Sequence, residues 1–212
     1  MTNLIYWPTS KNYKNGANQF TREVVEPFFK KNNINTILDF GCGTWFRDSL
    51  YLTEKGFQVY CVELEEQIER MKLKNTLESA LKNGIKSVTQ EIPDITFDSA
   101  LIHYVIDVTE TQEKRKQIIN KVSSQVKDNG YISLSVISET AVKQLKTGEK
   151  FNDGFKFLHS KQDNTYTFLK DYRKYNDEKE KNGFIPTIED CGLEVVIESN
   201  QPYAFFAIAQ KS

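Results

Sequence analysis

Short apolar runs alternate with amphipathic stretches along most of the chain. Apolar runs bounded by Gly, Pro or Asn are typical of buried strands, and the stretches between them have the spacing of surface helices. The pattern therefore predicts alternating strands and helices. The expected strands cover residues 36–40, 58–64, 87–89, 99–104, 131–137, 193–199 and 204–210.

A helix is expected between the fourth and fifth strands, in "TETQEKRKQIINKVSSQVKDNG". Ile118, Ile119, Val122 and Val126 fall on one face of such a helix. Gly130 is a typical residue for its C-terminal end, because glycine accepts the left-handed conformation found there. The helix is thus expected to run up to Gly130.

The last two strands are joined only by "NQP", which permits an antiparallel hairpin and forbids a parallel crossover. The expected fold class is α/β. It has a mostly parallel seven-stranded sheet, helices on both faces and an antiparallel strand at the C-terminus. The whole of residues 1–212 is expected to form one domain, with an N-terminal lead-in over 1–33.

The region 142–181 departs from this rhythm, since it shows no clear strand. An insertion between two late strands would lie above the C-terminal edge of the sheet, where open α/β folds bind ligands. Its many rings suit either a lid over a site or a small satellite core, and His159 is a candidate substrate contact within it. The aromatic residues are Phe151, Phe155, Phe157, Tyr166, Phe168, Tyr172 and Tyr175.

Composition narrows the class of protein. The chain has 212 residues, with 28 Lys and Arg against 29 Asp and Glu, so no global basic field attracts nucleic acid. Cys42, Cys61 and Cys191 are scattered without a C-x-x-C pair, which argues against a disulfide framework or a metal site. With no visible secretory signal and no run of about 18 apolar residues, the sequence predicts a cytoplasmic protein away from membranes.

The stretch "TILDFGCGTWFRDSL" carries the most informative chemistry. Gly41 and Gly43 follow a strand directly, where glycine accepts positive φ and lets a ligand approach the backbone. The helix expected after them would point its N-terminal N–H groups at that ligand. Glu63 ends the next strand about 20 residues beyond Gly43, where a carboxylate can accept both hydroxyls of a ribose.

Two cofactors suit this arrangement. The dinucleotide fingerprint G-x-G-x-x-G requires glycine at position 46, which is Phe46. S-adenosylmethionine sites more often show an acid two residues before the first glycine, and Asp39 supplies it. Trp45, however, occupies the position of their third glycine.

The motif "LDFGCGTWFRDSLYLTEKGFQVYCVELEEQ" resembles the first two motifs of class I S-adenosylmethionine-dependent methyltransferases, which have a Rossmann-like three-layer fold. "FDSALIHYVIDVTETQEKRKQIINKVSSQVKDNGYISLSV" resembles their fourth and fifth strands with the intervening helix. The likeness covers roughly residues 15–137 and the closing hairpin. "YVIDVTETQEKRKQIINKV" is also similar to a bacterial subgroup found beside phage or DNA-modification genes.

The resemblance implies S-adenosylmethionine as cofactor, with S-adenosylhomocysteine as product. The cofactor's methionine part would be bordered by the acid and the glycine turn, its ribose held by the acid of the second strand, and its adenine contacted from two loops. The fourth strand would end close to the methyl group. The residues implied for the methionine part are Asp39, Gly41, Cys42, Gly43 and Trp45. The resemblance implies Glu63 for the ribose and Leu64 and Glu91 for the adenine. Near the methyl group it implies His103 and Tyr104.

Two of these residues have alternative roles. Trp45 would either cover the cofactor or fill its pocket, and the second case would leave a catalytically silent binding protein. His103 is either a general base, since imidazole titrates near neutrality, or a histidine that is merely hydrogen-bonded at a strand end. The N-terminal rings Tyr6, Trp7 and Tyr13 would either close over the cofactor or pack on the sheet.

A small molecule is the expected acceptor, because the protein is nearly neutral and the insertion is aromatic. A nucleic acid or a protein of a modification system is the alternative. The sequence "IHYVID" lacks the Pro-Pro-Tyr turn with which amino-methylating DNA enzymes hold an extruded base. An NAD-dependent oxidoreductase is disfavoured by Phe46 and the closing hairpin, and the sequence does not indicate the oligomeric state.

Overall fold

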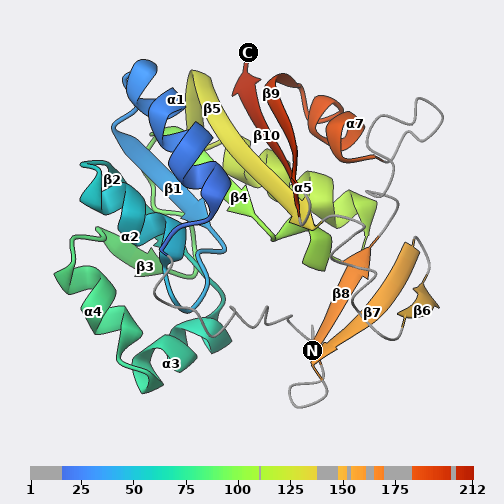
Figure 1. The fold of residues 1–212 in the computed structure, drawn as a ribbon, viewed down its shortest axis with the longest axis horizontal. Coiled ribbons are helices and arrows are strands. Elements are labelled where there is room, and N and C mark those ends of the chain that lie inside the picture. The colour runs from blue at the N-terminus through green and yellow to red at the C-terminus, as the bar shows by residue number, and fades with distance from the viewer. Residues whose placement is uncertain are drawn as a thin grey trace.

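The computed structural model describes residues 16–109, 111–137, 148–151, 154–160, 165–169, 183–201 and 204–212. These residues form a seven-stranded sheet with helices packed on it and a separate three-stranded sheet (Figure 1). The expected α/β class is confirmed.

The large sheet has the strand order β3-β2-β1-β4-β5-β10-β9. The strands β1, β2, β3, β4 and β5 pair in parallel, whereas β10 is antiparallel to both β5 and β9, as the short "NQP" connection predicted. The bounds are β1 Thr36–Phe40, β2 Gln58–Val62, β3 Ser87–Thr89, β4 Phe97–His103, β5 Val126–Ile137, β9 Leu193–Gln201 and β10 Ala204–Lys211.

Two apolar cores lie on opposite faces of this sheet. Ile37 belongs to one core and Leu38 to the other, because successive side chains of a strand point to opposite faces. The face of Ile37 is covered by η2 (Thr21–Val25), α1 (Glu26–Lys31), α2 (Arg47–Glu54), α3 (Glu65–Leu73) and α4 (Thr76–Lys82). The face of Leu38 is covered by α5 (Gln112–Ser123) and α7 (Phe184–Glu189).

The expected extent of the helix before β5 was wrong. The helix α5 ends at Ser123, and Gly130 lies inside β5. Phe97 pairs with Val126 but Ser99 pairs with Tyr131, so four residues of β5 bulge opposite Asp98. A Cβ on Gly130 would lie 2.7 Å from the carbonyl oxygen of Asp98, so this glycine is required by close packing and not by a helix end.

The region 142–181 also differs from the expectation of no clear strand. It contains β6 (Gly148–Phe151), β7 (Gly154–Ser160) and β8 (Thr165–Leu169), which form an antiparallel three-stranded sheet. The strand β8 lies beside η3 (Ile106–Val108), the short helix that follows β4. The side chains of this insertion, including its rings and His159, lie outside the described ones, as do Tyr6, Trp7 and Tyr13.

The helices in the described ranges are all too short and too polar to cross a membrane.

We expect Gly130→Ala to lower the free energy of unfolding by about 1–3 kcal/mol, because the new methyl group has no room beside Asp98 and Val126. Urea denaturation of the purified variant measures this. The matched control is Asn129→Gly. The exposed Asn129 already has a left-handed φ of 61°, and glycine adopts this conformation without strain. Equal stability of Gly130→Ala and wild type would contradict the packing argument.

Candidate functional site

The two glycines of the turn after β1 serve different purposes. Gly41 has φ 82° and Gly43 has φ 67°, so both have the left-handed conformation that favours glycine. A Cβ on Gly41 would collide with Cγ2 of Val105, whereas a Cβ on Gly43 would meet no heavy atom within 4 Å. Gly41 is therefore fixed by packing against the loop after β4, and Gly43 borders open space that a ligand can enter.

Glu63 lies directly across from Gly43. Its Oε2 accepts a hydrogen bond from the Gly43 N–H at 2.9 Å, and its Oε1 accepts one from the Leu64 N–H at 3.0 Å. The side chain is nearly buried, and this burial raises the pKa of the carboxyl although the two N–H groups act in the opposite direction. An ionised carboxylate offers about four lone-pair sites, so two remain for the hydroxyls of a ribose.

Asp39 is the second buried carboxyl at the turn. It is only 4% exposed, and the hydroxyl of Ser49, in the first turn of α2, donates a hydrogen bond to its Oδ2. Burial raises the pKa of Asp39 to about 7, against a lowering by the Ser49 hydroxyl and a further increase from Asp48. A positively charged group of a ligand would stabilise the ionised form of this carboxyl.

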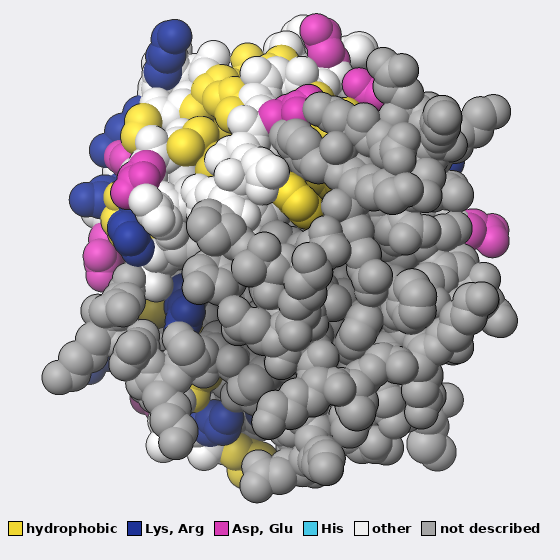
Figure 2. Space-filling view, turned by 45° about the vertical axis from the view of Figure 1, so that its right-hand side comes forward, with side chains coloured by type: hydrophobic (Ala, Val, Ile, Leu, Met, Phe, Trp, Pro, Cys, Tyr) yellow, Lys and Arg dark blue, Asp and Glu magenta, His cyan; other side chains and the backbone are white. Residues whose placement is uncertain are grey.

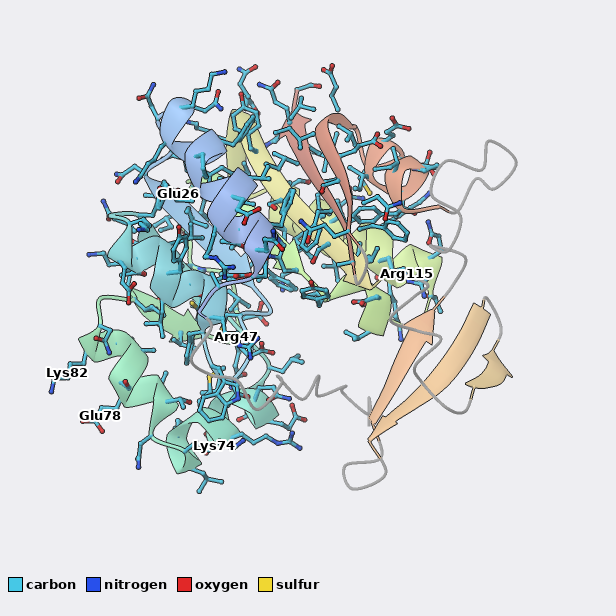
Figure 3. All side chains as sticks on the ribbon, in the orientation of Figure 1. Glu26, Arg47, Lys74, Glu78, Lys82 and Arg115 are labelled. Carbon is cyan, nitrogen blue, oxygen red and sulfur yellow. The ribbon has the colours of Figure 1, made fainter. Side chains whose placement is uncertain are left out.

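Trp45 turns toward α3. The Nζ of Lys74, directly after α3, lies 5.3 Å from the centre of the indole, a distance typical of a cation–π contact. The neighbouring Phe46 has a left-handed φ of 49° and is 1% exposed within the core under α2. The turn thus buries Phe46 and leaves Trp45 partly exposed beside Lys74, which is labelled in Figure 3.

The other residues expected at the cofactor have different surroundings. Leu64 is 42% exposed beside Glu63, as a residue that contacts a ligand ring could be. Cys42 is partly buried in the turn, where burial and the neighbouring Cys61 raise the pKa of its thiol. Glu91 is exposed and pairs with Lys121 of α5, Oε2 to Nζ at 3.0 Å, so its carboxylate lies on the surface.

Tyr104 directly follows the C-terminal end of β4, as expected. It has a left-handed φ of 58°, an unusual backbone conformation for an aromatic residue. Its N–H donates to the carbonyl oxygen of Ser135 at 3.1 Å, and its ring packs edge-on against Phe206 of β10. Burial raises the pKa of its hydroxyl well above the usual value.

The ring of His103 makes contacts that its sequence position did not reveal. Its Nδ1 lies 3.0 Å from Oδ2 of Asp48 in α2, and its Nε2 lies 2.9 Å from Oγ of Ser133 in β5. Asn18 adds its backbone N–H and side-chain amide as donors to the same Asp48 carboxylate, at 2.9 and 2.6 Å. No sequence motif marks Asp48, Ser133 or Asn18, because their meeting depends on the tertiary fold.

Solved structures similar to this one define the class of the fold. An S-adenosylmethionine-dependent methyltransferase from Clostridium acetobutylicum matches with a TM-score of 0.61, 13% identity and 91% of each chain covered. The magnesium protoporphyrin IX methyltransferase ChlM from Synechocystis, solved with bound S-adenosylhomocysteine, matches with a TM-score of 0.61, 17% identity and coverage of 92% of this chain and 83% of its own. The protein PH0226 from Pyrococcus horikoshii matches with a TM-score of 0.64, 15% identity and 95% of each chain covered.

The fold is thus that of the class I S-adenosylmethionine-dependent methyltransferases, as the motifs predicted. The model of the family described as tellurite resistance protein TehB matches residues 10–182, and the chain belongs to this family. No curated protein matches the sequence. Family and fold together identify an enzyme of the methyltransferase class, and S-adenosylmethionine is the cofactor that the names of the similar enzymes give.

The residues at the turn fit this cofactor. Gly43 borders open space, Glu63 has acceptor capacity for ribose hydroxyls, and Asp39 is a buried carboxyl suited to a positively charged group. The structure brings these three together from the ends of β1 and β2.

Substitution of each glycine by alanine distinguishes the packing role of Gly41 from the ligand-facing role of Gly43. We expect Gly41→Ala to lower the free energy of unfolding by about 2 kcal/mol or more, because the methyl group collides with Val105 in addition to the backbone strain. Gly43→Ala carries strain of about 1 kcal/mol without a collision, but its methyl group would enter the space proposed for the cofactor. Denaturation and titration with S-adenosylhomocysteine measure the two effects. If Gly43→Ala bound the product as wild type does, the cofactor would not pass over this glycine.

The pKa of Asp39 predicts a pH dependence of stability. The folded protein holds this proton up to about pH 7, whereas an unfolded aspartate loses it near 3.8, so wild-type stability should fall as pH rises through this window. Asp39→Asn removes that loss. We therefore expect the stability difference, variant minus wild type, to become more positive from pH 4.5 to pH 8, by a few kcal/mol at most. Urea denaturation across this range measures it, and parallel curves for the two proteins would contradict the raised pKa.

Proposed function

We propose that this TehB-family protein binds S-adenosylmethionine across the turn Gly41–Gly43 and transfers the methyl group to a small-molecule acceptor. The cofactor supplies a methyl group that its sulfonium already makes electrophilic, so the protein's contribution is mainly to align the nucleophile. In this proposal Glu63 accepts the ribose hydroxyls, and Asp39 faces the positively charged methionine part. Leu64 contacts the adenine.

The observation that carries the proposal is the hydrogen bond from Gly43 to Glu63 beside open space. It places a carboxylate with spare acceptor capacity 2.9 Å from the backbone of a turn that a ligand can approach. Trp45 supports the same interpretation, because its contact with Lys74 turns it toward α3. A silent fold with Trp45 inside the cofactor pocket finds no support in that contact.

The acceptor is proposed to enter where the three-stranded sheet meets the loop after β4. The backbone supports this, since β8 lies beside η3 and Tyr104 directly follows the strand that leads there. His103 and Tyr104 remain the expected residues nearest the methyl group. Glu91 is the least supported cofactor contact, because its carboxylate pairs with Lys121 on the surface and would have to leave that pair to reach an adenine.

Charge and family favour a small acceptor over a nucleic acid. On the face drawn in Figure 2, Lys and Arg lie interspersed with Asp and Glu among the described residues at its left-hand border, so this border carries both signs of charge. ChlM, which shares the fold, is named for a small substrate, and the family name refers to tellurite. Tellurite and small aromatic compounds are therefore the first acceptors to assay.

The proposal predicts that Glu63 controls affinity for the product. Wild type should bind S-adenosylhomocysteine in the micromolar range, about −8 kcal/mol, in a calorimetric titration. Glu63→Gln should weaken binding at least tenfold, because an amide cannot accept from the ribose and from both backbone N–H groups as a carboxylate does.

The matched control is Glu66→Gln, which alters an exposed acid three residues further on in α3. It should bind as wild type does. Failure of wild type to bind S-adenosylhomocysteine would overturn the proposal, and equal losses in both variants would show that Glu63 has no specific role.

A further inference from the structure

Four polar side chains from four parts of the chain form a continuous hydrogen-bonded series on the Ile37 side of the sheet. Asn18 lies just before η2, Asp48 is in the first turn of α2, His103 ends β4, and Ser133 lies in β5. Asn18 donates to Asp48, Asp48 contacts His103, and His103 contacts Ser133. The His103 and Asp48 side chains are only 6% and 14% exposed.

The donors around Asp48 assign the protons in this series. The carboxylate receives the Asn18 N–H and amide, and burial of Asp48, which alone would raise its pKa, is outweighed by the hydrogen bonds from His103 and Asn18. An ionised carboxylate only accepts, so Nδ1 of His103 must carry a proton. Nε2 lies within hydrogen-bond distance of the Ser133 hydroxyl, which can either donate to it or accept from it.

This arrangement leaves His103 poorly suited to act as a base. Both ring nitrogens have partners within the protein. The rings of Phe206 and His103 pack edge to face, with their centroids 6.1 Å apart. A general base needs a nitrogen lone pair within reach of the acceptor's proton. The order serine, histidine, aspartate also resembles a hydrolytic triad, but Ser133 is 0% exposed and cannot be reached by a substrate.

The same contacts hold the start of α2. Asp48 is followed by Ser49, whose hydroxyl donates to Asp39 at the turn. The first turn of α2 is therefore fixed on two sides, by Asp39 of β1 through Ser49 and by His103 of β4 through Asp48. This first turn begins four residues after Gly43, and the N–H groups of a helix's first turn have no partner within the helix and can donate to a ligand.

We propose that His103 is a positioning residue, which acts through Asp48 to hold the N-terminal turn of α2 in the place that cofactor binding requires. The inference rests on the proposed function. It assigns Asp48 and His103 to the cofactor side of the site, so substitution of either residue should weaken binding of the cofactor.

Substitutions of His103 distinguish positioning from catalysis without knowledge of the acceptor. Asn can place an amide N–H where Nδ1 lies and keep the contact with Asp48, whereas Leu removes both contacts. We expect His103→Leu to weaken S-adenosylhomocysteine binding at least tenfold, and His103→Asn to stay within about threefold of wild type. Ser133→Ala, which leaves the Asp48 contact intact, should also bind as wild type does.

Amide hydrogen exchange at residues 50–53, whose N–H groups bond to the carbonyl groups of Phe46 and of the first turn of α2, gives a second readout that needs no ligand. Exchange should be faster in His103→Leu than in wild type and His103→Asn, because the first turn of α2 is released. If wild type did not bind S-adenosylhomocysteine, the proposed function would fail, and the exchange data would still decide whether His103 holds the first turn of α2.

Unchanged affinity together with unchanged exchange in a folded His103→Leu protein would overturn the positioning role. Equal loss of affinity in His103→Asn and His103→Leu would also overturn it, because the Asp48 contact would then not matter. If His103→Leu fails to fold, Asp48→Asn decides in its place. Binding weakened tenfold with faster exchange at the start of α2 supports the inference, and wild-type behaviour overturns it.

Discussion

The parallel pairing of β1 with both β2 and β4 is the constraint on which the site depends. Asp39 pairs with Cys61 on one side and with Leu101 on the other, so the three strands reach the same edge of the sheet together. The glycine turn, Glu63 and the His103 series each begin within a few residues of that edge. Because the register is fixed by apolar residues that alternate between two cores, a slip of one residue would move all three groups to the wrong face.

Stability and function oppose each other at this edge. Asp39 and Glu63 are buried carboxyls whose pKa values are raised by burial, which shows that the folded protein without ligand accommodates their charges poorly. Asp48, only nine residues from Asp39, has a lowered pKa because donors surround it. The protein thus surrounds Asp48 with donors and leaves the two carboxyls that are proposed to face the cofactor less well paired.

The residues of the site that local sequence could predict are those with a local cause. Gly41, Gly43 and Glu63 follow from strand, turn and strand within one continuous segment. Asp48 and Ser133 could not be predicted, because they lie 85 residues apart in sequence. The packing of α2 on the sheet and the pairing of β4 with β5 bring them to the same His103 ring.

Two parts of the fold differ from what the sequence predicts, namely the end of the helix before β5 and the region 142–181. Gly130 follows a helical pattern in the sequence and so predicts a helix end, whereas the bulge opposite Asp98 that requires a glycine arises from packing between strands. Phe155, Lys156 and Phe157 of β7 alternate, as do Tyr166, Thr167 and Phe168 of β8, but such short runs do not by themselves distinguish a strand from a loop rich in aromatic residues. Seven strands of the large sheet, by contrast, were recognisable because most are buried on both faces.

The position of β10 has a consequence for the order in which the molecule can assemble. It is the last strand in the described chain, yet it lies between β5 and β9 inside the sheet. Its Phe206 stacks on Phe20 at 4.3 Å and packs edge-on against His103 and Tyr104. During synthesis, β5 therefore keeps an unpaired edge until β10 leaves the ribosome, and until then the rings that pack around the end of β4 are incomplete.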